Sequence, residues 1–457
     1  MVSLLKASSA FVIPSIVFYL IYLCLRAGIR TEREAKVKHA LIGVVIIWIV
    51  APFVGGFPYY IRGVLDLTSS FFESMSGWTT TGLTMVEYPE NLFGGNEDML
   101  FYRSLTHLVG GIGIIALGLL FLVRDAPVAA AYYASEKGDQ RLRPGLKGTA
   151  GEVWKIYMMY TFAGIMLLYL VGMPFFEAIN HSFAAIATGG LSPYSDSIGH
   201  YNSFAVEVVT MLIMLAGATS FIVHYQIFNG NYRKLFGNIE IRYMMFFLVV
   251  STAALIFYFS ASDAMDSMNV HSPYDVFRKS IYQVVSCMTT TGFSTTNVEH
   301  WPPFALTILM ILMYVGASYA STGGALKILR FAIVVATIKK MLKRMVLPKN
   351  AVCLTRVAGR TISDKESLEA LALAAAFLVF AILGAMVLML VCGYTGYESL
   401  TTSFSAIGNV GMGFITGARW YDMPMIGKNT ITTLMFLGRI EIFPALIVFK
   451  SFFEKRG

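Results

Sequence analysis

Long apolar runs alternate with short polar or basic stretches along the whole chain. A run of about 20 residues is long enough to cross a hydrocarbon core of about 30 Å as a helix. After one run near the start, the pattern falls into four blocks, each with an apolar run, a polar interval and a second apolar run. It therefore predicts nine membrane-spanning helices, near 9–27, 39–60, 102–123, 154–175, 204–228, 243–261, 304–337, 367–392 and 429–449.

The polar interval of each block contains a related motif rich in threonine, serine and glycine. The four motifs are TTTGLT at 79–84, ATGGLS at 187–192, TTTGFST at 289–295 and GNVGMG at 408–413. An internal repeat of this kind decides the architecture, because each copy is one structural unit. The repeat predicts an N-terminal helix at 1–30 followed by four units at 31–125, 126–230, 231–345 and 346–457.

About ten residues before each motif, the sequence predicts a short half-helix, such as TSSFFESMSGW and YESLTTSFSAI. These segments are too short to span a membrane and too polar to face lipid, which favours re-entrant helices buried among the spans. Aligning the motifs gives one glycine column, with serine or alanine six positions earlier. The glycines are Gly82, Gly190, Gly292 and Gly411, and the earlier residues are Ser76, Ala184, Ser286 and Ser405.

Non-helical backbone at membrane depth is tolerated only inside protein or beside a water-filled pathway. Four such loops on one axis would form rings of carbonyl oxygens, which can replace the hydration shell of a monovalent cation. Glycine permits the positive φ that turns a carbonyl inward, and threonine adds a hydroxyl oxygen. A lone TTTG would be an ordinary turn, but four copies predict a selectivity filter. Its expected residues are Thr80, Thr81, Gly82, Leu83, Thr188, Gly189, Gly190, Leu191, Thr290, Thr291, Gly292, Phe293, Asn409, Val410, Gly411 and Met412.

Composition and charge agree with an all-α integral membrane protein. Hydrophobic residues make up 56% of the chain and charged residues 14%, against about 25% charged in soluble domains. Mean hydropathy is +0.65. Most of the 35 lysines and arginines fall in stretches between apolar runs, which the positive-inside rule assigns to the cytoplasm. The stretches are 26–38, 124–147, 233–242, 339–365 and 450–456.

This charge distribution predicts an N-terminus outside the cell and a cytoplasmic C-terminus. Nucleic acid is not an expected partner, because no soluble domain carries basic residues interleaved with aromatic ones. The loops at 124–152 and 339–366 either satisfy the topology rule alone or also dock a cytosolic partner.

Candidate chemistry elsewhere in the chain is sparse. Cys24, Cys287, Cys353 and Cys392 lack metal-ligand spacing, and no GxxxxGK[ST], HExxH or GxSxG motif occurs. The glycine-rich HLVGGIGI at 107–114 follows no strand, so His107 is expected to be a packing residue. No catalytic residues, bound cofactor or transition metal are therefore expected, and a membrane-embedded enzyme is a weak alternative.

At the level of motifs, the chain resembles the Trk/Ktr/HKT superfamily of potassium transporters, most closely the bacterial Trk potassium uptake membrane subunit. The resemblance covers about 35–455 and is carried by SGWTTTGLT, HLVGGIGI, HSFAAIATGGLS, TTTGFST, GASYASTGGALKILR and GRIEIF. It implies a pseudo-fourfold arrangement of four helix–pore loop–helix repeats around one pore, with potassium as the transported ion. It also implies a homodimer in the bacterial cytoplasmic (inner) membrane, regulated by a separate cytosolic nucleotide-binding subunit (TrkA-like). Family members usually carry two helices before the first repeat, whereas this chain shows one.

A run of small residues at 316–326 interrupts the second apolar run of the third block. Close helix packing through small residues is one interpretation. Helix breaks inside membranes also mark functional sites, and the resemblance implies an intramembrane gating loop below the filter. The expected gate residues are Gly316, Ser318, Ser321, Thr322, Gly323, Gly324, Lys327 and Arg439.

Charged residues in these apolar runs are functional candidates, because an isolated charge in lipid is costly. Arg439 is expected either to face the pore beneath the filter or to bridge to a carboxylate or backbone carbonyls. Lys327 and Arg330 either belong to the same site or extend to the cytoplasmic interface. A symporter driven by sodium or protons is the alternative function, although no acidic pair stands out within the spans.

Overall fold

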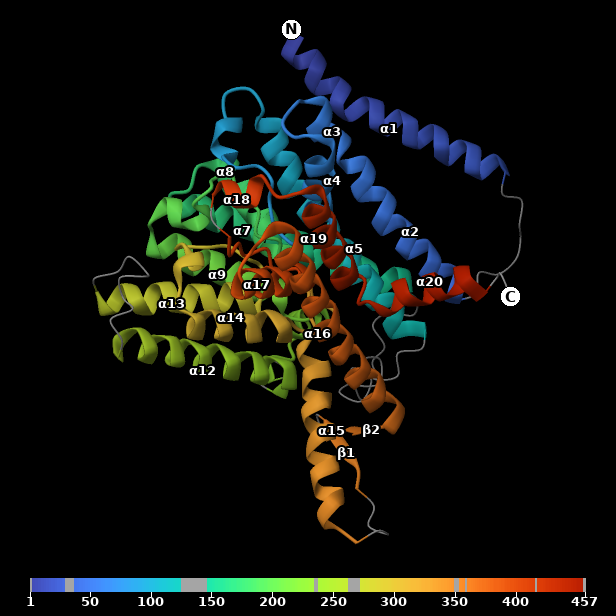
Figure 1. Cartoon of the computed structure of the whole chain (residues 1–457), viewed down its shortest axis with the longest axis vertical. Helices are drawn as coiled ribbons and strands as arrows, with labels where there is room; N and C mark the ends of the chain where they lie inside the picture. The colour runs from blue at the N-terminus through green and yellow to red at the C-terminus, as the bar shows by residue number, and fades with distance from the viewer. Residues whose placement is uncertain are drawn as a thin grey trace.

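The computed structural model of the chain is almost entirely α-helical (Figure 1). It describes residues 2–28, 37–124, 146–233, 237–261, 272–348, 353–357, 360–415 and 417–454. The α-helices are α1 (Val2–Gly28), α2 (Val37–Gly55), α3 (Phe57–Ile61), α4 (Leu67–Trp78), α5 (Glu97–Arg124), α7 (Leu146–Leu170), α8 (Phe175–Ile186), α9 (Phe204–Ala218), α10 (Phe221–Phe228), α12 (Ile239–Ala261), α13 (Pro273–Met288), α14 (Pro303–Val315), α15 (Ile328–Val346), α16 (Asp364–Cys392), α17 (Gly396–Ile407), α18 (Ala418–Tyr421), α19 (Met425–Arg439) and α20 (Phe443–Glu454). The remaining elements are the 3-10 helices η1 (Pro89–Leu92), η2 (Ser197–Tyr201) and η4 (Val298–His300), and an antiparallel hairpin of β1 (Thr355–Val357) and β2 (Arg360–Ile362).

Several described helices are long and apolar enough to cross a membrane. Four qualify by length and composition, at Ile42–Ile61, Gly151–Leu170, Ile239–Ala261 and Asp364–Cys392. Two bent helix pairs, α9 with α10 and α19 with α20, would raise this number to six. These helices support a multi-pass membrane protein. Helix α1 lies where the N-terminal helix was predicted, and its apolar part, Ser9–Leu23, is shorter than the candidate spans, so its crossing of the membrane and the total of nine spans stay predictions.

The predicted half-helices are confirmed as the short, largely buried helices α4, α8, α13 and α17. Each packs between a longer helix that precedes it and one that follows it in the chain: α4 contacts α2 and α5, α8 contacts α7 and α9, α13 contacts α12 and α14, and α17 contacts α16 and α19. Side-chain caps mark the start of three of them, and at α13 the Ser272 hydroxyl accepts a hydrogen bond from the Tyr274 N–H. The Asp66 carboxylate accepts hydrogen bonds from the first turn of α4, and Thr395 forms a capping box with Glu398 at the start of α17.

The span predicted at 204–228 forms two helices rather than one straight helix, and its crossing of the membrane stays a prediction. Helices α9 and α10 are bent by 100° after Ala218. The carbonyl of Ala218 accepts a hydrogen bond from the Ser318 backbone N–H at 3.0 Å, and the Phe221 N–H donates to the Ala320 carbonyl at 3.1 Å. Backbone groups freed at the bend are therefore bonded by a segment about 100 residues away in sequence, as helix breaks in membranes require.

The span predicted at 429–449 is likewise bent, by 104° between α19 and α20. Glu441 and Ile442 form the bend with φ values of 61° and 59°. A left-handed backbone costs a residue other than glycine about 1–2 kcal/mol, so surrounding contacts must hold this conformation. One such contact is the ion pair between Glu441 and Arg330 of α15, with a nitrogen–oxygen distance of 2.6 Å.

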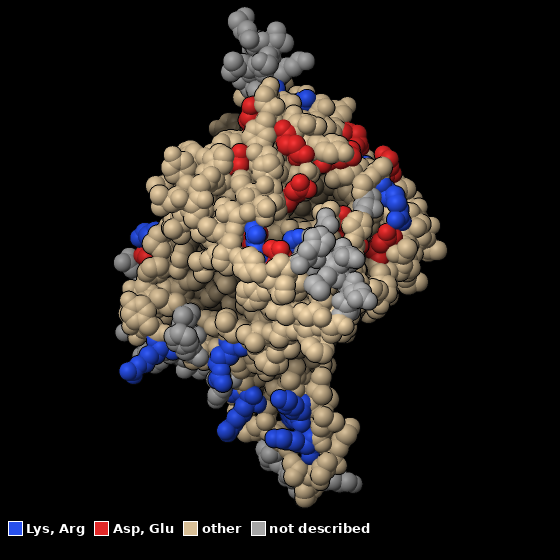
Figure 2. Space-filling view, turned by 90° about the vertical axis from the view of Figure 1, so that its left-hand side faces the viewer, with Lys and Arg blue, Asp and Glu red and all other residues tan. Residues whose placement is uncertain are grey.

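Helix α15 and the β1–β2 hairpin project from the body of the molecule, at the bottom of Figure 1. In Figure 2, Lys and Arg side chains gather around this projection, whereas Asp and Glu gather toward the opposite end. Lys343 and Arg344 are among the exposed basic residues of the projection. This separation agrees with the basic stretch predicted at 339–365. Most of the stretches at 26–38 and 124–147 lie outside the described residues.

Candidate functional site

Each of the four short helices ends in one of the repeated motifs, which we name L1 (79–84), L2 (187–192), L3 (289–295) and L4 (408–413). The second residue of each loop has a left-handed backbone, with φ of 50° at Thr80, 51° at Thr188, 57° at Thr290 and 52° at Asn409. The fourth residue is the aligned glycine, with φ of 93° at Gly82, 78° at Gly190, 83° at Gly292 and 85° at Gly411. The four sequence motifs thus share one backbone conformation.

The aligned glycines lie directly against the backbone of a neighbouring loop. A Cβ atom placed on any of them would approach a backbone oxygen more closely than the 3.0 Å that real Cβ atoms respect. The pairs are Gly82 with the Gly189 oxygen, Gly190 with the Thr291 oxygen, Gly292 with the Val410 oxygen, and Gly411 with the Thr81 oxygen. The loops therefore contact one another in a closed cycle from L1 through L4 and back to L1. Glycine is required because both the backbone conformation and the space exclude a side chain.

The column of serine and alanine residues attaches each loop to its helix. In every repeat the backbone carbonyl of this residue accepts a hydrogen bond from the third residue of the loop, at 2.8–2.9 Å. The Ser76 hydroxyl also accepts from the Gly82 N–H at 3.0 Å. Ser286 donates to the Phe293 carbonyl at 2.7 Å and Ser405 to the Met412 carbonyl at 2.9 Å. The predicted residues Phe293 and Met412 thus have carbonyls bonded toward their own helices.

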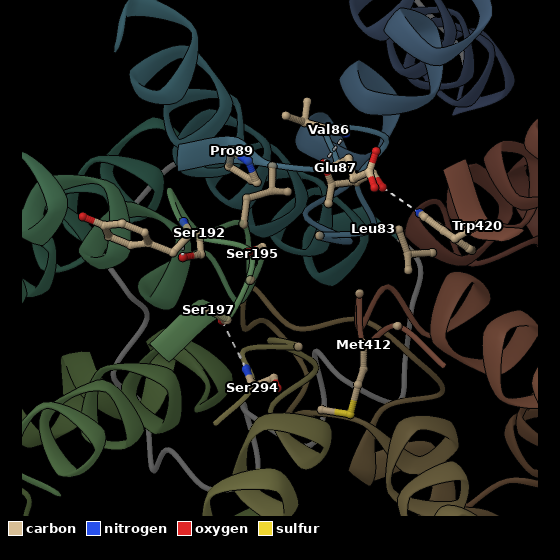
Figure 3. A pocket seen from close by; sticks show the side chains of 18 of the residues that line it. Leu83, Val86, Glu87, Pro89, Ser192, Ser195, Ser197, Ser294, Met412 and Trp420 are labelled. Atoms are coloured by element: carbon tan, nitrogen blue, oxygen red, sulfur yellow. Dashed lines mark hydrogen bonds between the residues drawn. The ribbon is translucent and has the colours of Figure 1, made fainter. Parts of the chain in front are cut away.

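A cavity of about 250 Å³ opens at the loops, and the four aligned glycines are among the residues that line it (Figure 3). Other residues that line it include Glu87, Ser195 and Trp420. Ser197 and Ser294 also line it, and the Ser294 N–H donates a hydrogen bond to the Ser197 hydroxyl at 3.2 Å. At the fifth position of the loops the side chains are at most 3% exposed, in Leu83, Leu191, Phe293 and Met412. The loops therefore present mainly backbone to the cavity.

Tyrosines at the rim of the cavity carry no charge at neutral pH. Partial burial raises the pKa of Tyr194 to about 12, and the neighbouring Glu177 carboxylate adds to this shift. The Tyr194 hydroxyl donates a hydrogen bond to Glu177 at 2.8 Å. Glu87 and Glu299 are acidic side chains that line the cavity, and Arg103, which is paired with Glu73, lines it as well.

The loop threonines have two different roles. Thr81 and Thr291 share hydroxyl hydrogen bonds of 2.8 Å with Thr79 and Thr289, so these side chains brace their own loops. At the second loop position, L4 has Asn409 where the other three loops have threonine. The Asn409 amide donates to the Thr81 hydroxyl at 3.0 Å and to the Met435 carbonyl at 2.8 Å.

The other left-handed residues face the interruption at 316–327. Thr188 donates to the Thr322 hydroxyl at 3.2 Å, and the Thr290 hydroxyl accepts from the Gly324 N–H at 2.8 Å. The hydroxyl oxygens predicted to line the inner end of the filter thus contact the predicted gate. Thr80 makes no side-chain hydrogen bond within the described part of the chain.

The segment 316–327 between α14 and α15 is non-helical and fully buried. Ala320, Ala325 and Lys327 adopt left-handed backbone conformations, with φ of 55°, 61° and 76°. A Cβ on Gly324 would meet the Gly408 oxygen of L4 and Asn409. The segment thus contacts L2, L3 and L4 at their helix-proximal ends, which is more than simple packing of small residues between helices.

Arg439 is buried to 1% exposure and bonds backbone carbonyls, one of the two alternatives open from sequence. Its guanidinium donates to the Thr322 carbonyl at 2.8 Å and to the Gly110 carbonyl at 3.0 Å. Lys327 donates to the Gly323 carbonyl and is 4% exposed, so of its two alternatives the extension to the interface does not hold. Arg330 pairs with Glu441. The 316–327 segment is therefore contacted by the guanidinium of Arg439 and also by the carboxylate of Glu240, which accepts from the Tyr319 N–H at 2.7 Å.

One buried charged pair next to the loops escaped the sequence analysis. Glu73 in α4 and Arg103 in α5 form an ion pair of 2.9 Å and contact both L1 and L2. The signal that could have identified them was visible, because a carboxylate in a predicted half-helix and an arginine in a predicted span are both costly to bury alone.

The chain is similar in sequence to known cation transport proteins over most of its length. The sequence profile of the TrkH family, described as a cation transport protein, matches residues 7–455. An uncharacterized cation transporter of Methanocaldococcus jannaschii is 30% identical over 446 residues, covering 97% of this chain and 89% of the relative. The Trk system potassium uptake protein TrkH of Vibrio parahaemolyticus is 32% identical over 434 residues, covering 92% of this chain and 86% of the relative.

A solved structure is similar over nearly the whole chain. The crystal structure of the potassium transporter TrkH from Vibrio parahaemolyticus superposes with a TM-score of 0.82 at 27% sequence identity. The similarity covers 98% of this chain and 94% of that chain. The structural similarity and the match to the family profile therefore cover nearly the same part of the chain.

Proposed function

The chain belongs to the TrkH family of cation transport proteins, and on that premise we propose that it conducts potassium ions through a gated pore whose filter is formed by L1 to L4. Several relatives, among them TrkH of Vibrio parahaemolyticus, are named for potassium uptake, and the similar crystal structure is that of a potassium transporter. Family membership also agrees with the expectation of a transporter rather than an enzyme.

The observation that carries this proposal is the closed cycle of glycine–backbone contacts among the four loops. We propose that the four units surround one axis with pseudo-fourfold symmetry. Carbonyl oxygens of Thr80, Thr81, Gly82 and their counterparts would then replace the hydration shell of a potassium ion. Repeated packing of each short helix between its neighbours supports the arrangement. Nine spans, with the amino terminus outside and the carboxyl terminus inside, complete the proposed topology.

Transport down the electrochemical gradient requires no coupled ion. A membrane potential supplies about 2.3 kcal/mol per charge per 100 mV, which sustains roughly fiftyfold accumulation of a monovalent cation. The acidic side chains of Glu87 and Glu299, which line the cavity, would favour cation entry. Potassium is the transported substrate in this proposal, and the chain itself needs no bound cofactor.

We propose that residues 316–327 form the gate below the filter. Their hydrogen bonds to Thr188 and Thr290 place this segment against the left-handed residues of L2 and L3. Arg439 and Lys327 would add an electrostatic barrier to cations while the segment occupies this position. The proposal includes a homodimer and a cytosolic nucleotide-binding partner of the TrkA type, which would act on the basic projection around α15.

Ion flux in liposomes tests the function directly. The purified protein is reconstituted, the voltage is fixed with an ionophore, and uptake of radioactive rubidium is measured with and without sodium and pH gradients. Uptake that follows voltage alone and is inhibited by potassium more than by sodium is expected. Uptake that requires a sodium or pH gradient would establish the symport alternative, and no uptake above empty liposomes would refute transport.

A further inference from the structure

The ion pair of Glu73 with Arg103 is almost completely buried: Glu73 is 0% exposed and Arg103 is 2% exposed. The Arg103 Nε atom donates to Glu73 Oε1 at 2.9 Å. Removing two charges from water is expensive, so a buried ion pair is weak evidence of a stabilising role by itself. The surrounding hydrogen bonds indicate what this pair does instead.

Within the described residues, the other side-chain hydrogen bonds of the pair go to residues at or directly after the ends of L1 and L2. Glu73 accepts hydrogen bonds from the Met85 N–H at 2.7 Å and from the Thr84 hydroxyl at 2.9 and 3.0 Å. Arg103 donates to the same Thr84 hydroxyl at 3.0 Å and to the Ser192 carbonyl at 3.2 Å. Thr84 ends L1 and Ser192 ends L2, so one ion pair holds two adjacent loops in register. Charge-assisted bonds are roughly twice as strong as neutral ones, which suits a rigid support.

The other three repeats carry uncharged residues at the position of Glu73, one helical turn before the serine and alanine column. These residues are His181, Gln283 and Thr402, each at most 1% exposed. The His181 Nε2 atom forms a hydrogen bond of 3.1 Å with the Ser192 hydroxyl. The Gln283 amide and the Thr402 hydroxyl have no hydrogen-bond partner among the described residues. Charged support is therefore present behind L1 and absent at the equivalent positions behind L2, L3 and L4.

We propose that Glu73 and Arg103 are specificity-determining positioning residues that set the spacing between L1 and L2 and thereby the preference for potassium over sodium. The inference rests on the proposed function. Neither side chain contacts the ion in this scheme, and both act through the backbone of the loops. Binding groups must be held within about 0.5 Å of their working geometry by a rigid surrounding shell, and this pair provides that shell on one side.

Glu73→Gln tests the proposal, because it keeps the shape of the side chain and removes its charge. We expect potassium preference over sodium in rubidium-flux competition to fall about tenfold, which corresponds to about 1.4 kcal/mol. Thr84→Val is the second variant, because it removes the shared hydroxyl and leaves the ion pair in place. Glu207→Gln is the matched control. Glu207 forms a comparable buried pair with Arg278, at 2.7 and 2.9 Å, that joins α9 to α13 and bonds no loop residue within the described ranges.

The outcomes separate this inference from the proposed function. Wild-type protein that carries no flux would refute the function itself. If wild-type protein conducts and Glu73→Gln keeps its potassium preference within twofold, the positioning role is refuted. Equal loss of preference in Glu207→Gln would also refute it, since a general loss of stability would then explain both results. If Glu73→Gln does not yield monodisperse protein, Thr84→Val takes its place. Reduced potassium preference in Thr84→Val would support the positioning role, and unchanged preference would refute it.

Discussion

Replacing Gly292 with serine probes the cycle of loop contacts at one point. Gly292 has φ of 83°, and a Cβ there would overlap the Val410 carbonyl oxygen while lying 2.9 Å from its carbon. Two penalties therefore act together. The left-handed backbone costs a serine about 1–2 kcal/mol, and the overlap forces the Val410 carbonyl to move on the order of 1 Å.

The size of the displacement sets the expected effect on selectivity. A carbonyl of L4 moved on the order of 1 Å exceeds the roughly 0.5 Å tolerance of a working binding site. We therefore expect Gly292→Ser to reduce potassium preference over sodium at least about tenfold, or about 1.4 kcal/mol. Gly172→Ser is the control that separates the two penalties. Gly172 has φ of 98° but no atom within 4 Å of its Cβ position, so it pays the backbone cost without displacing a neighbour.

The assay is competition of potassium and sodium against rubidium uptake in liposomes, with protein amount and monodispersity matched between variants. Gly172→Ser should retain wild-type competition curves even where its thermal stability falls. Unchanged competition in monodisperse Gly292→Ser protein would show that the L3–L4 contact does not shape the filter, and the reasoning would fail.

Three further predictions follow from the same structure. Deleting about five residues within 318–324 should raise partner-independent flux with near wild-type selectivity, since buried loops of this kind belong to the low-stability end of a fold; lower flux in monodisperse protein would contradict a gating role. A cysteine introduced at Lys343 should react with an impermeant maleimide only after cell lysis, and labelling of intact cells would reverse the proposed topology. Glu441→Gln removes the ionic partner of Arg330 and should destabilise the detergent-solubilised protein by about 1–3 kcal/mol, measured by thermal unfolding; an unchanged melting temperature would mean that the pair does not hold the α19–α20 bend.

The repeat, the short helices and the aligned glycines were predictable because their signals are local. Each apolar run and each polar interval lies within a few tens of residues, and the glycine column arises because one short motif occurs four times. The bend after Ala218 was not predictable in the same way. It depends on a hydrogen bond donated by the Ser318 N–H and on one accepted by the Ala320 carbonyl. A local hydrophobic pattern does not reveal partners that lie about 100 residues away in the sequence.

The direction in which the loop side chains point could also not be predicted from the sequence. Thr81 and Thr80 are adjacent and chemically identical, yet one braces its loop and the other does not. Their difference comes from backbone dihedral angles that the sequence motif alone does not specify. Buried charges were visible as residue types, but the pairing of Glu73 with Arg103 across two helices required coordinates.

The cycle of loop contacts also has a consequence for biosynthesis. L1 is completed by L4, and the hydrogen bond from Asn409 to Thr81 joins residues 328 positions apart. Ribosomes add about 5–20 residues per second, so L1 waits roughly 15–65 s for its last neighbour to be synthesised. During this interval the first repeats sit in the membrane with one side of L1 uncovered. A chain truncated before the fourth repeat should therefore expose polar backbone to lipid or to quality-control proteases instead of forming a smaller pore.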